Sequence, residues 1–281
     1  MSSANSTLGN FLKISLFSLI FILFLSSCVS SPKIPLDTKR QISLENSTSI
    51  FKIDYNHKYE RDASLINYCI RQSLPELKAW GGLKYSVKVH VYATHNDLER
   101  AVGRHGYPWL RAWAKFQNIH IQTPSSWNGY RIEKRVCELV QHELTHVVMY
   151  QHVGDANNWY KKKIPLWFRE GMASNVAKQG YRRMSKNAIQ QYYRSPEFMG
   201  DPITDGDKLI KNNPKLVYSA AHWAFADLLE TYGRQRIVLL IKLIGKGEKF
   251  RIAWEKTFGI KLLAFEKNWS EKMSTVGTGG G

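Results

Sequence analysis

The chain has 281 residues and a formal net charge of +17, from 40 Lys and Arg against 23 Asp and Glu. Such a balance favours anionic surfaces, for example lipid head groups or acidic wall polymers. Nucleic acid is the weakest of these partners, because the basic residues are scattered and no recognised nucleic-acid-binding module is present. The composition therefore argues against a nucleic-acid partner, and no internal repeat is visible.

The first 27 residues have the pattern of an export signal. Lys13 precedes an apolar run from Ile14 to Leu25, which is too short to span a bilayer core of ~30 Å but fits the ~7–15-residue core of a signal peptide. The run ends in Leu-Ser-Ser-Cys at Cys28. This ending resembles a bacterial lipobox, which implies lipidation of Cys28, a location in the cell envelope, and the outer membrane if the cell has one. A signal anchor that stays in the membrane is the alternative.

Composition divides the chain into a leader, a linker and one domain. Removal of 27 of the 281 residues leaves 254, the length of one ordinary domain. Residues 28–48 are rich in Ser, Thr, Pro and charge, so we expect a flexible linker. The folded domain is expected at 49–273, and the Gly-rich residues 274–281 are expected to be disordered.

Hydrophobic periodicity predicts an α+β domain. Taken in chain order, the pattern predicts a helix at 62–77, a strand at 87–93, a helix at 96–104, a strand at 118–122, helices at 131–150 and 165–178, a loop at 196–213, and helices at 215–232, 234–244, 248–257 and 262–273. The helix at 131–150 carries apolar residues at three- and four-residue steps, so one face should contact a core. Early strands followed by many helices indicate an α+β domain with a mainly helical C-terminal part.

The helix at 131–150 contains His142-Glu143-Leu144-Thr145-His146. Residues four apart share one helix face, so the two imidazoles can bind one Zn²⁺ ion. Glu143 is turned by ~100° from His142, which places its carboxylate beside the metal as a general base. Random placement of the His and Glu residues predicts about 0.014 such matches in this chain. A chance match is therefore a poor explanation.

A catalytic zinc site with two His needs a third ligand, commonly a carboxylate. The best candidate is Glu170, which lies 24 positions after His146 in the segment Pro-Leu-Trp-Phe-Arg-Glu-Gly-Met-Ala at 165–173. The alternative for Glu170 is an ordinary carboxylate on a helix surface.

The two motifs together resemble the gluzincin zinc metallopeptidases, and most closely the peptidase MA-like group of bacterial proteins, over about Val87 to Trp269. The resemblance implies a zincin-like fold and Glu170 as the third zinc ligand. One position departs from the pattern: gluzincins often place an acidic residue four positions after this ligand to orient a zinc-bound His, and here Ser174 stands there. Tyr218 stands where the family usually has a Tyr that binds the oxyanion, and His222 is the other candidate for this role. The alternative for both residues is packing in the core.

Two further features leave alternatives open. In zincins an edge strand shortly before the active-site helix binds extended substrate, and the strand at 118–122 stands in that order, so it is either such an edge or a plain structural strand. Cys69 and Cys137 lie in predicted helices and form either one disulfide or two buried thiols, since sequence does not give their separation.

The sequence thus predicts a zinc-dependent metallopeptidase that hydrolyses peptide bonds and is anchored to the envelope by its lipid. His142, His146 and Glu170 would hold Zn²⁺, Glu143 would act as the general base, and Tyr218 would bind the oxyanion. The partner would be a peptide or protein substrate. One rival is a non-catalytic lipoprotein whose zinc-stabilised domain binds a partner or an anionic surface, and another is a basic envelope-binding module with an incidental motif.

Overall fold

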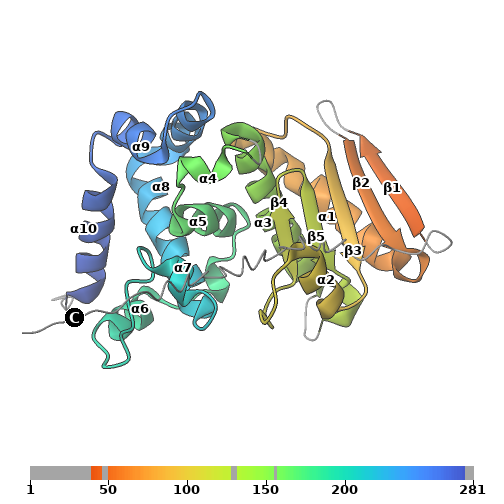
Figure 1. Cartoon of the computed structure of the whole chain (residues 1–281), viewed down its shortest axis with the longest axis horizontal. Coiled ribbons are helices and arrows are strands. Elements are labelled where there is room, and N and C mark those ends of the chain that lie inside the picture. The colour runs from red at the N-terminus through yellow and green to blue at the C-terminus, as the bar shows by residue number, and fades with distance from the viewer. Residues whose placement is uncertain (1–38, 46–49, 128–131, 155–156, 276–281) are drawn as a thin grey trace, which may run out of the picture. The chain divides into compact units, whose positions relative to one another are not determined.

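The protein has an α+β fold, as the sequence predicts. The computed structural model describes residues 39–45, 50–127, 132–154 and 157–275, in which a five-stranded mixed sheet is followed by a mainly helical part (Figure 1). The expected signal peptide and Cys28 lie outside the described residues. Within the described ranges, no helix is long and apolar enough to cross a membrane.

The sheet has the strand order β1-β2-β3-β5-β4. The strands are β1 (Lys39–Glu45), β2 (Ile50–Asn56), β3 (Val87–Tyr92), β4 (Ala112–Lys115) and β5 (Asn118–Gln122). The three central strands, β2, β3 and β5, are parallel, and the two edge strands run antiparallel to their neighbours. Both strands predicted from alternation are confirmed, as β3 and β5.

The position of β5 corrects the edge-strand interpretation. Residues 118–122 lie inside the sheet between β3 and β4, and the edge is β4, whose Ala112 and Ala114 pair with Ile121 and Ile119. A tight connection through Phe116, which has a φ of 55°, joins the two strands. Strand β4 was not predicted because it has only four residues, and two of these are alanines that give little hydrophobic signal.

Part of the expected linker also belongs to the sheet. Residues 39–45, which the composition placed within a flexible linker at 28–48, form β1 and pair with β2 from Lys39 opposite Asn56 to Glu45 opposite Ile50. The sheet therefore begins before the expected domain boundary at Ser49. Main-chain pairing at an edge does not need an apolar pattern, which is why a polar composition concealed this strand.

Helices supply the rest of the fold. They are α1 (Glu60–Ala79), α2 (His95–Val102), α3 (Ile132–Val153), α4 (Trp159–Lys162), α5 (Leu166–Val176), α6 (Lys186–Tyr193), α7 (Gly206–Leu209), α8 (Pro214–Gly245), α9 (Phe250–Phe258) and α10 (Leu262–Ser274), with short 3-10 turns η1 (His57–Tyr59), η2 (Pro124–Ser126) and η3 (Gly180–Arg182). The helices predicted at 215–232 and 234–244 are the two arms of α8. Gly233 separates them, because its φ of 75° interrupts the helix.

Helix α3 connects the two parts of the fold. It packs against α1 and β4 on one side and against α5 and α8 on the other (Figure 1). Val136, Leu144, Val147 and Val148 of its apolar stripe are fully buried. Burial of such a side chain contributes about 1.5–3 kcal/mol, far more than helix propensity, so tertiary packing holds α3 in place.

A disulfide fixes the start of α3. Sγ of Cys69 on α1 bonds Sγ of Cys137 on α3, with Cα atoms 4.6 Å apart. Of the two alternatives that the sequence left open, the structure therefore has the disulfide. The covalent link lies five positions before His142 on the same helix, so it ties the helix that carries His142 and His146 to α1.

Candidate metal centre

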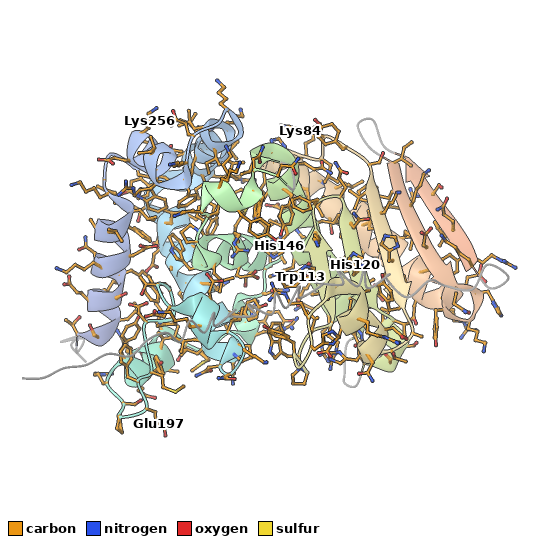
Figure 2. The ribbon with its side chains drawn as sticks, in the orientation of Figure 1. Lys84, Trp113, His120, His146, Glu197 and Lys256 are labelled. Carbon is orange, nitrogen blue, oxygen red and sulfur yellow. A yellow bond between two sulfur atoms is a disulfide. The ribbon has the colours of Figure 1, made fainter. Side chains whose placement is uncertain are left out.

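The two histidines of the motif project from the same face of α3. Nε2 of His142 lies 3.2 Å from Nε2 of His146, and their ring planes are nearly perpendicular, with centroids 4.8 Å apart. His142 is buried and His146 is partly buried. Figure 2 shows His146 between the helices and the sheet. A helix brings two nitrogen atoms to one point in this way because its i and i+4 side chains are neighbours.

Glu170 reaches the same point from α5. Its Oε2 lies 3.3 Å from Nε2 of His142 and 3.4 Å from Nε2 of His146. The three atoms therefore form a nearly equilateral triangle. A tetrahedral zinc ion with bonds of about 2.0–2.1 Å holds neighbouring ligand atoms about 3.3–3.4 Å apart, so the separations and the donor set fit zinc.

A close approach of α5 to α8 determines where Glu170 lies. A Cβ atom added at Gly171 would stand 2.3 Å from the carbonyl oxygen of Ala221 and 2.6 Å from Cβ of Phe225, so only glycine allows this contact. Asn175 then links the two helices, since its Nδ2 donates to the carbonyls of Gly171 and His222 at 2.8 and 2.9 Å. The glycine that follows the predicted ligand thus has a packing role that positions the ligand.

A second contact holds the start of α5. The indole Nε1 of Trp167 donates to Oε1 of Glu266 on α10 at 2.8 Å, and Trp167 is 1% exposed. Nε1 of Trp269 donates in turn to Asp227 of α8 at 3.2 Å. Glu266 and Trp269 belong to the C-terminal part of the sequence resemblance, and the structure gives them a structural role in placing α5.

Burial and opposite charges determine the protonation of the three residues. Burial lowers the pKa of His142 to about 4, which keeps its imidazole neutral at pH 7. Burial would also lower the pKa of His146, but the charge of Glu170 raises it above its usual value. Burial would raise the pKa of Glu170, yet the charge of His146 and the hydrogen bonds from both rings hold it well below its usual range. Glu170 is therefore a carboxylate at pH 7, as a metal ligand must be.

Glu143 lies beside the triangle without belonging to it. Its side chain is 5% exposed, and burial raises its pKa to about 7, with the nearby Glu170 adding to the effect and His146 opposing it. Strand β4 contributes too, since the backbone N–H of Ala114 faces the carboxyl group and lowers its pKa. A carboxyl with this environment is suited to accept and release a proton near neutral pH.

Tyr218, on α8, lines the same small cavity as Glu143, His146 and Glu170. Its ring packs edge-on against Trp109 with centroids 5.6 Å apart, and the Arg183 guanidinium lies 5.5 Å from its centroid. Burial raises its pKa well above the usual value, and the charges of Glu170 and Glu143 raise it further. The phenol therefore keeps its proton and can act as a hydrogen-bond donor.

Ser174 and His222 do not reach the triangle. Oγ of Ser174 lies 3.0 Å from Nδ1 of His222 and accepts from Nε of Arg183 at 3.0 Å. It therefore does not orient a zinc-binding imidazole, and Nδ1 of His142 has no hydrogen-bond partner among the described residues. His222 is absent from the residues that line the two cavities at Glu143, which leaves Tyr218 as the better placed of the two oxyanion candidates.

Sequence reasoning missed several residues that line the site. Ala112, Trp113 and Ala114 of β4 line the cavity at Glu143, and Figure 2 shows Trp113 near His146. Arg183 approaches from the segment that follows η3. No local pattern marks these residues, because only the pairing of β4 and the packing of η3 bring them to the motif.

Two comparisons with known proteins give no relative for this chain. No protein-family model matches the sequence, and no curated protein sequence matches it significantly.

Proposed function

We propose that the protein is a zinc-dependent metallopeptidase of the gluzincin type, with a zincin-like fold related to the peptidase MA-like group. The observation that carries the proposal is the triangle of His142 Nε2, His146 Nε2 and Glu170 Oε2, with sides of 3.2–3.4 Å. A buried glutamate with a raised pKa lies beside it. This combination supports a hydrolytic site more than a simple metal-binding site.

The number of protein ligands also favours catalysis. Structural zinc sites are normally closed by four protein ligands, whereas catalytic sites use three and keep one position for water or substrate. Among the described residues, the group of potential ligands around His142 has three members. The rival in which zinc only stabilises a partner-binding domain would require a fourth ligand at this point.

The side chains of the site can perform the proton transfers of peptide hydrolysis. Zinc held by the three ligands would polarise the scissile carbonyl and make an attacking water more acidic. Glu143 accepts the proton of that water and delivers it to the leaving amine, a role that its pKa of about 7 suits. The protonated hydroxyl of Tyr218 donates a hydrogen bond to the oxygen on which negative charge develops.

The proposed location is the cell envelope. Cys28 would carry the lipid, and Val29 after it resembles the pattern for sorting to the outer membrane if the cell has one. Anchoring by several acyl chains is stable, whereas a single chain binds only marginally. The proposed partners are the membrane, through this lipid, and a peptide or protein substrate.

Metal analysis of the purified full chain tests the proposal. Wild type should contain about one zinc per chain, and His142→Ala, His146→Ala and Glu170→Gln should each lose stoichiometric binding. His57→Ala, which removes an exposed imidazole on η1, is the matched control and should keep its zinc. Retention of one tightly bound zinc in both His142→Ala and His146→Ala would place the metal elsewhere and remove the basis of the proposal.

A further inference from the structure

Next to Glu143 is a second cavity whose wall is rich in arginine. It has a volume of about 150 Å³ and shares His142, Glu143 and Tyr218 with the proposed catalytic site. Four arginines from three separate parts of the fold line it. They are Arg111 directly before β4, Arg135 on α3, Arg182 at the end of η3, and Arg183 directly after it.

Arg182, Arg111 and Arg183 differ in the charge of the groups that they contact. Arg182 forms an ion pair with Glu138 at 3.0 Å. Arg111 donates instead to the backbone carbonyls of Pro108 and Leu110, both at 2.9 Å. Within the part of the chain that the structure describes, Arg111 has no carboxylate within ion-pair distance.

Arg183 is held in the same way by neutral acceptors. Its Nε donates to Ser174 at 3.0 Å and its NH2 group donates to Gln179 at 2.6 Å. Burial lowers the pKa of Arg183, and the neighbouring charge of Arg182 lowers it further. Burial likewise lowers the pKa of Arg111, with Arg135 adding to the effect. These like charges repel one another inside a partly buried cavity, and a bound anion would relieve the repulsion.

Two indole groups of the same cavity lack an acceptor. Trp109 and Trp127 line it, and Nε1 of each is buried with no hydrogen-bond partner among the described residues. Trp127 is 8% exposed. Buried donors in native proteins are nearly always paired, so two orphaned N–H groups beside several guanidinium groups indicate a missing acceptor.

We propose that this cavity is a subsite that binds a carboxylate of the substrate next to the scissile bond. Full ligand pockets measure about 300–1,000 Å³, so a cavity of about 150 Å³ suits a single acidic group and not a whole ligand. Guanidinium groups bind carboxylates through paired, charge-assisted hydrogen bonds, and the indole walls keep water away from these bonds. The carboxylate can come from the side chain of Glu or Asp or from the C-terminus of a peptide.

The inference rests on the proposed peptidase function, so the experiment separates the two. The zinc-loaded full chain is first incubated with an unfolded protein, and the cleavage sites are mapped by mass spectrometry. Matched peptides are then made that differ only in Glu or Gln at the enriched position, or in a free or amidated C-terminus. The absence of any cleavage would refute the proposed function, whereas cleavage with no preference for a carboxylate would refute only the subsite.

We expect kcat/KM to be at least about tenfold higher for the acidic member of one peptide pair. A preference within the Glu/Gln pair identifies a side-chain carboxylate, and a preference within the acid/amide pair identifies the C-terminus. Arg111→Gln and Arg135→Gln should each lower this ratio toward one. Arg251→Gln, which removes an exposed positive charge on α9, is the charge-matched control and should keep the wild-type ratio.

Zinc content and the rate on the neutral peptide show whether an arginine substitution has simply damaged folding. Misfolding lowers the rates on the acidic and the neutral peptide equally, so it leaves their ratio unchanged. A change in the ratio requires selective loss on the acidic peptide. An unchanged ratio in Arg111→Gln and Arg135→Gln, with folded and zinc-loaded protein, would overturn the proposal.

Discussion

Oγ of Ser174 on α5 lies 3.0 Å from Nδ1 of His222 on α8, so this contact links the two helices. Ser174 stands at the position where the resemblance leads one to expect an acidic residue that orients a zinc-bound histidine. The contact with His222, and the hydrogen bond from Arg183, give this hydroxyl a different role. We therefore expect Tyr218, and not His222, to donate the hydrogen bond that stabilises the oxyanion.

Tyr218→Phe tests that assignment, because it removes one hydroxyl and keeps the ring that packs against Trp109. If the hydroxyl stabilises the oxyanion, kcat should fall by about 10²–10³-fold while zinc content stays near one per chain. Stopped assays with a peptide substrate measure the change. His222→Gln is the comparison and should cost far less in kcat. Equal turnover in Tyr218→Phe and wild type would assign Tyr218 to packing alone.

Gly171→Ala tests whether the contact between α5 and α8 positions Glu170. The added Cβ would meet the Ala221 carbonyl oxygen at 2.3 Å, so the helices must separate. We expect a loss of about 1–3 kcal/mol in the free energy of unfolding and weaker zinc binding. Denaturant titration and a competing chelator give the two values.

Gly206→Ala is the matched control for this substitution. There the added Cβ meets no backbone atom but only the side chains of Leu166 and Val217, at 3.2 and 3.4 Å. Its zinc affinity should stay close to that of wild type. If Gly171→Ala bound zinc as tightly as Gly206→Ala, the contact would not be what positions Glu170.

The disulfide between Cys69 and Cys137 should contribute stability without contributing to the metal site. It closes a loop over a sequence separation of 68, for which chain entropy predicts a stabilisation of ~4 kcal/mol, with measured values of about 2–4 kcal/mol typical. Replacement of both cysteines by alanine should lower the free energy of unfolding by about 2–4 kcal/mol. Zinc content at low temperature should persist. An unchanged unfolding midpoint in the double variant would show that the link stabilises nothing.

His120 should make the stability of the protein depend on pH. Its ring stacks against those of His90 and Tyr92, with centroids 5.1 and 5.7 Å away, and its Nδ1 lies 2.9 Å from the Tyr92 hydroxyl oxygen, within hydrogen-bond distance. Burial lowers its pKa to about 4, and the charges of His90 and Lys115 add to the effect. The unfolded chain binds this proton more readily, since its His pKa is about 6.5, so the folded state loses stability as pH falls from about 6.5 toward 4.

His120→Gln removes this dependence. Between about pH 7.5 and 4, wild type should lose up to about 3 kcal/mol more unfolding free energy than the variant. Denaturant titrations on chelator-treated protein measure the difference without a contribution from metal release. A constant gap between the two proteins across this range would contradict the burial of a neutral His120.

Periodicity in the sequence was sufficient to predict the helix that carries the two histidines of the predicted metal site. The apolar stripe of α3 predicted 131–150, and the helix runs from Ile132 to Val153. Alternating valines likewise predicted β3. In both cases the residues that contact the core recur at a fixed local spacing, so the information lies within one segment.

Features that depend on distant contacts could not be predicted in this way. Strand β4 forms an edge of the sheet because it pairs with β5 on the side away from β3. The alternation of apolar residues within a strand does not specify this strand order. The arginines at 111, 135, 182 and 183 form one cavity wall only after α3, β4 and η3 have packed. The separation of Cys69 from Cys137 likewise follows from the packing of α1 on α3.

Hydrolysis by Glu143→Gln tests most sharply whether the protein is a zinc peptidase. The amide keeps the size of the buried side chain but does not accept a proton. Wild type should cleave an unfolded protein and lose that activity with a chelator. The variant should bind the same amount of zinc and hydrolyse the substrate at least about 10²-fold more slowly. Equal cleavage rates for the two zinc-loaded proteins, or no zinc-dependent cleavage by wild type, would contradict the account.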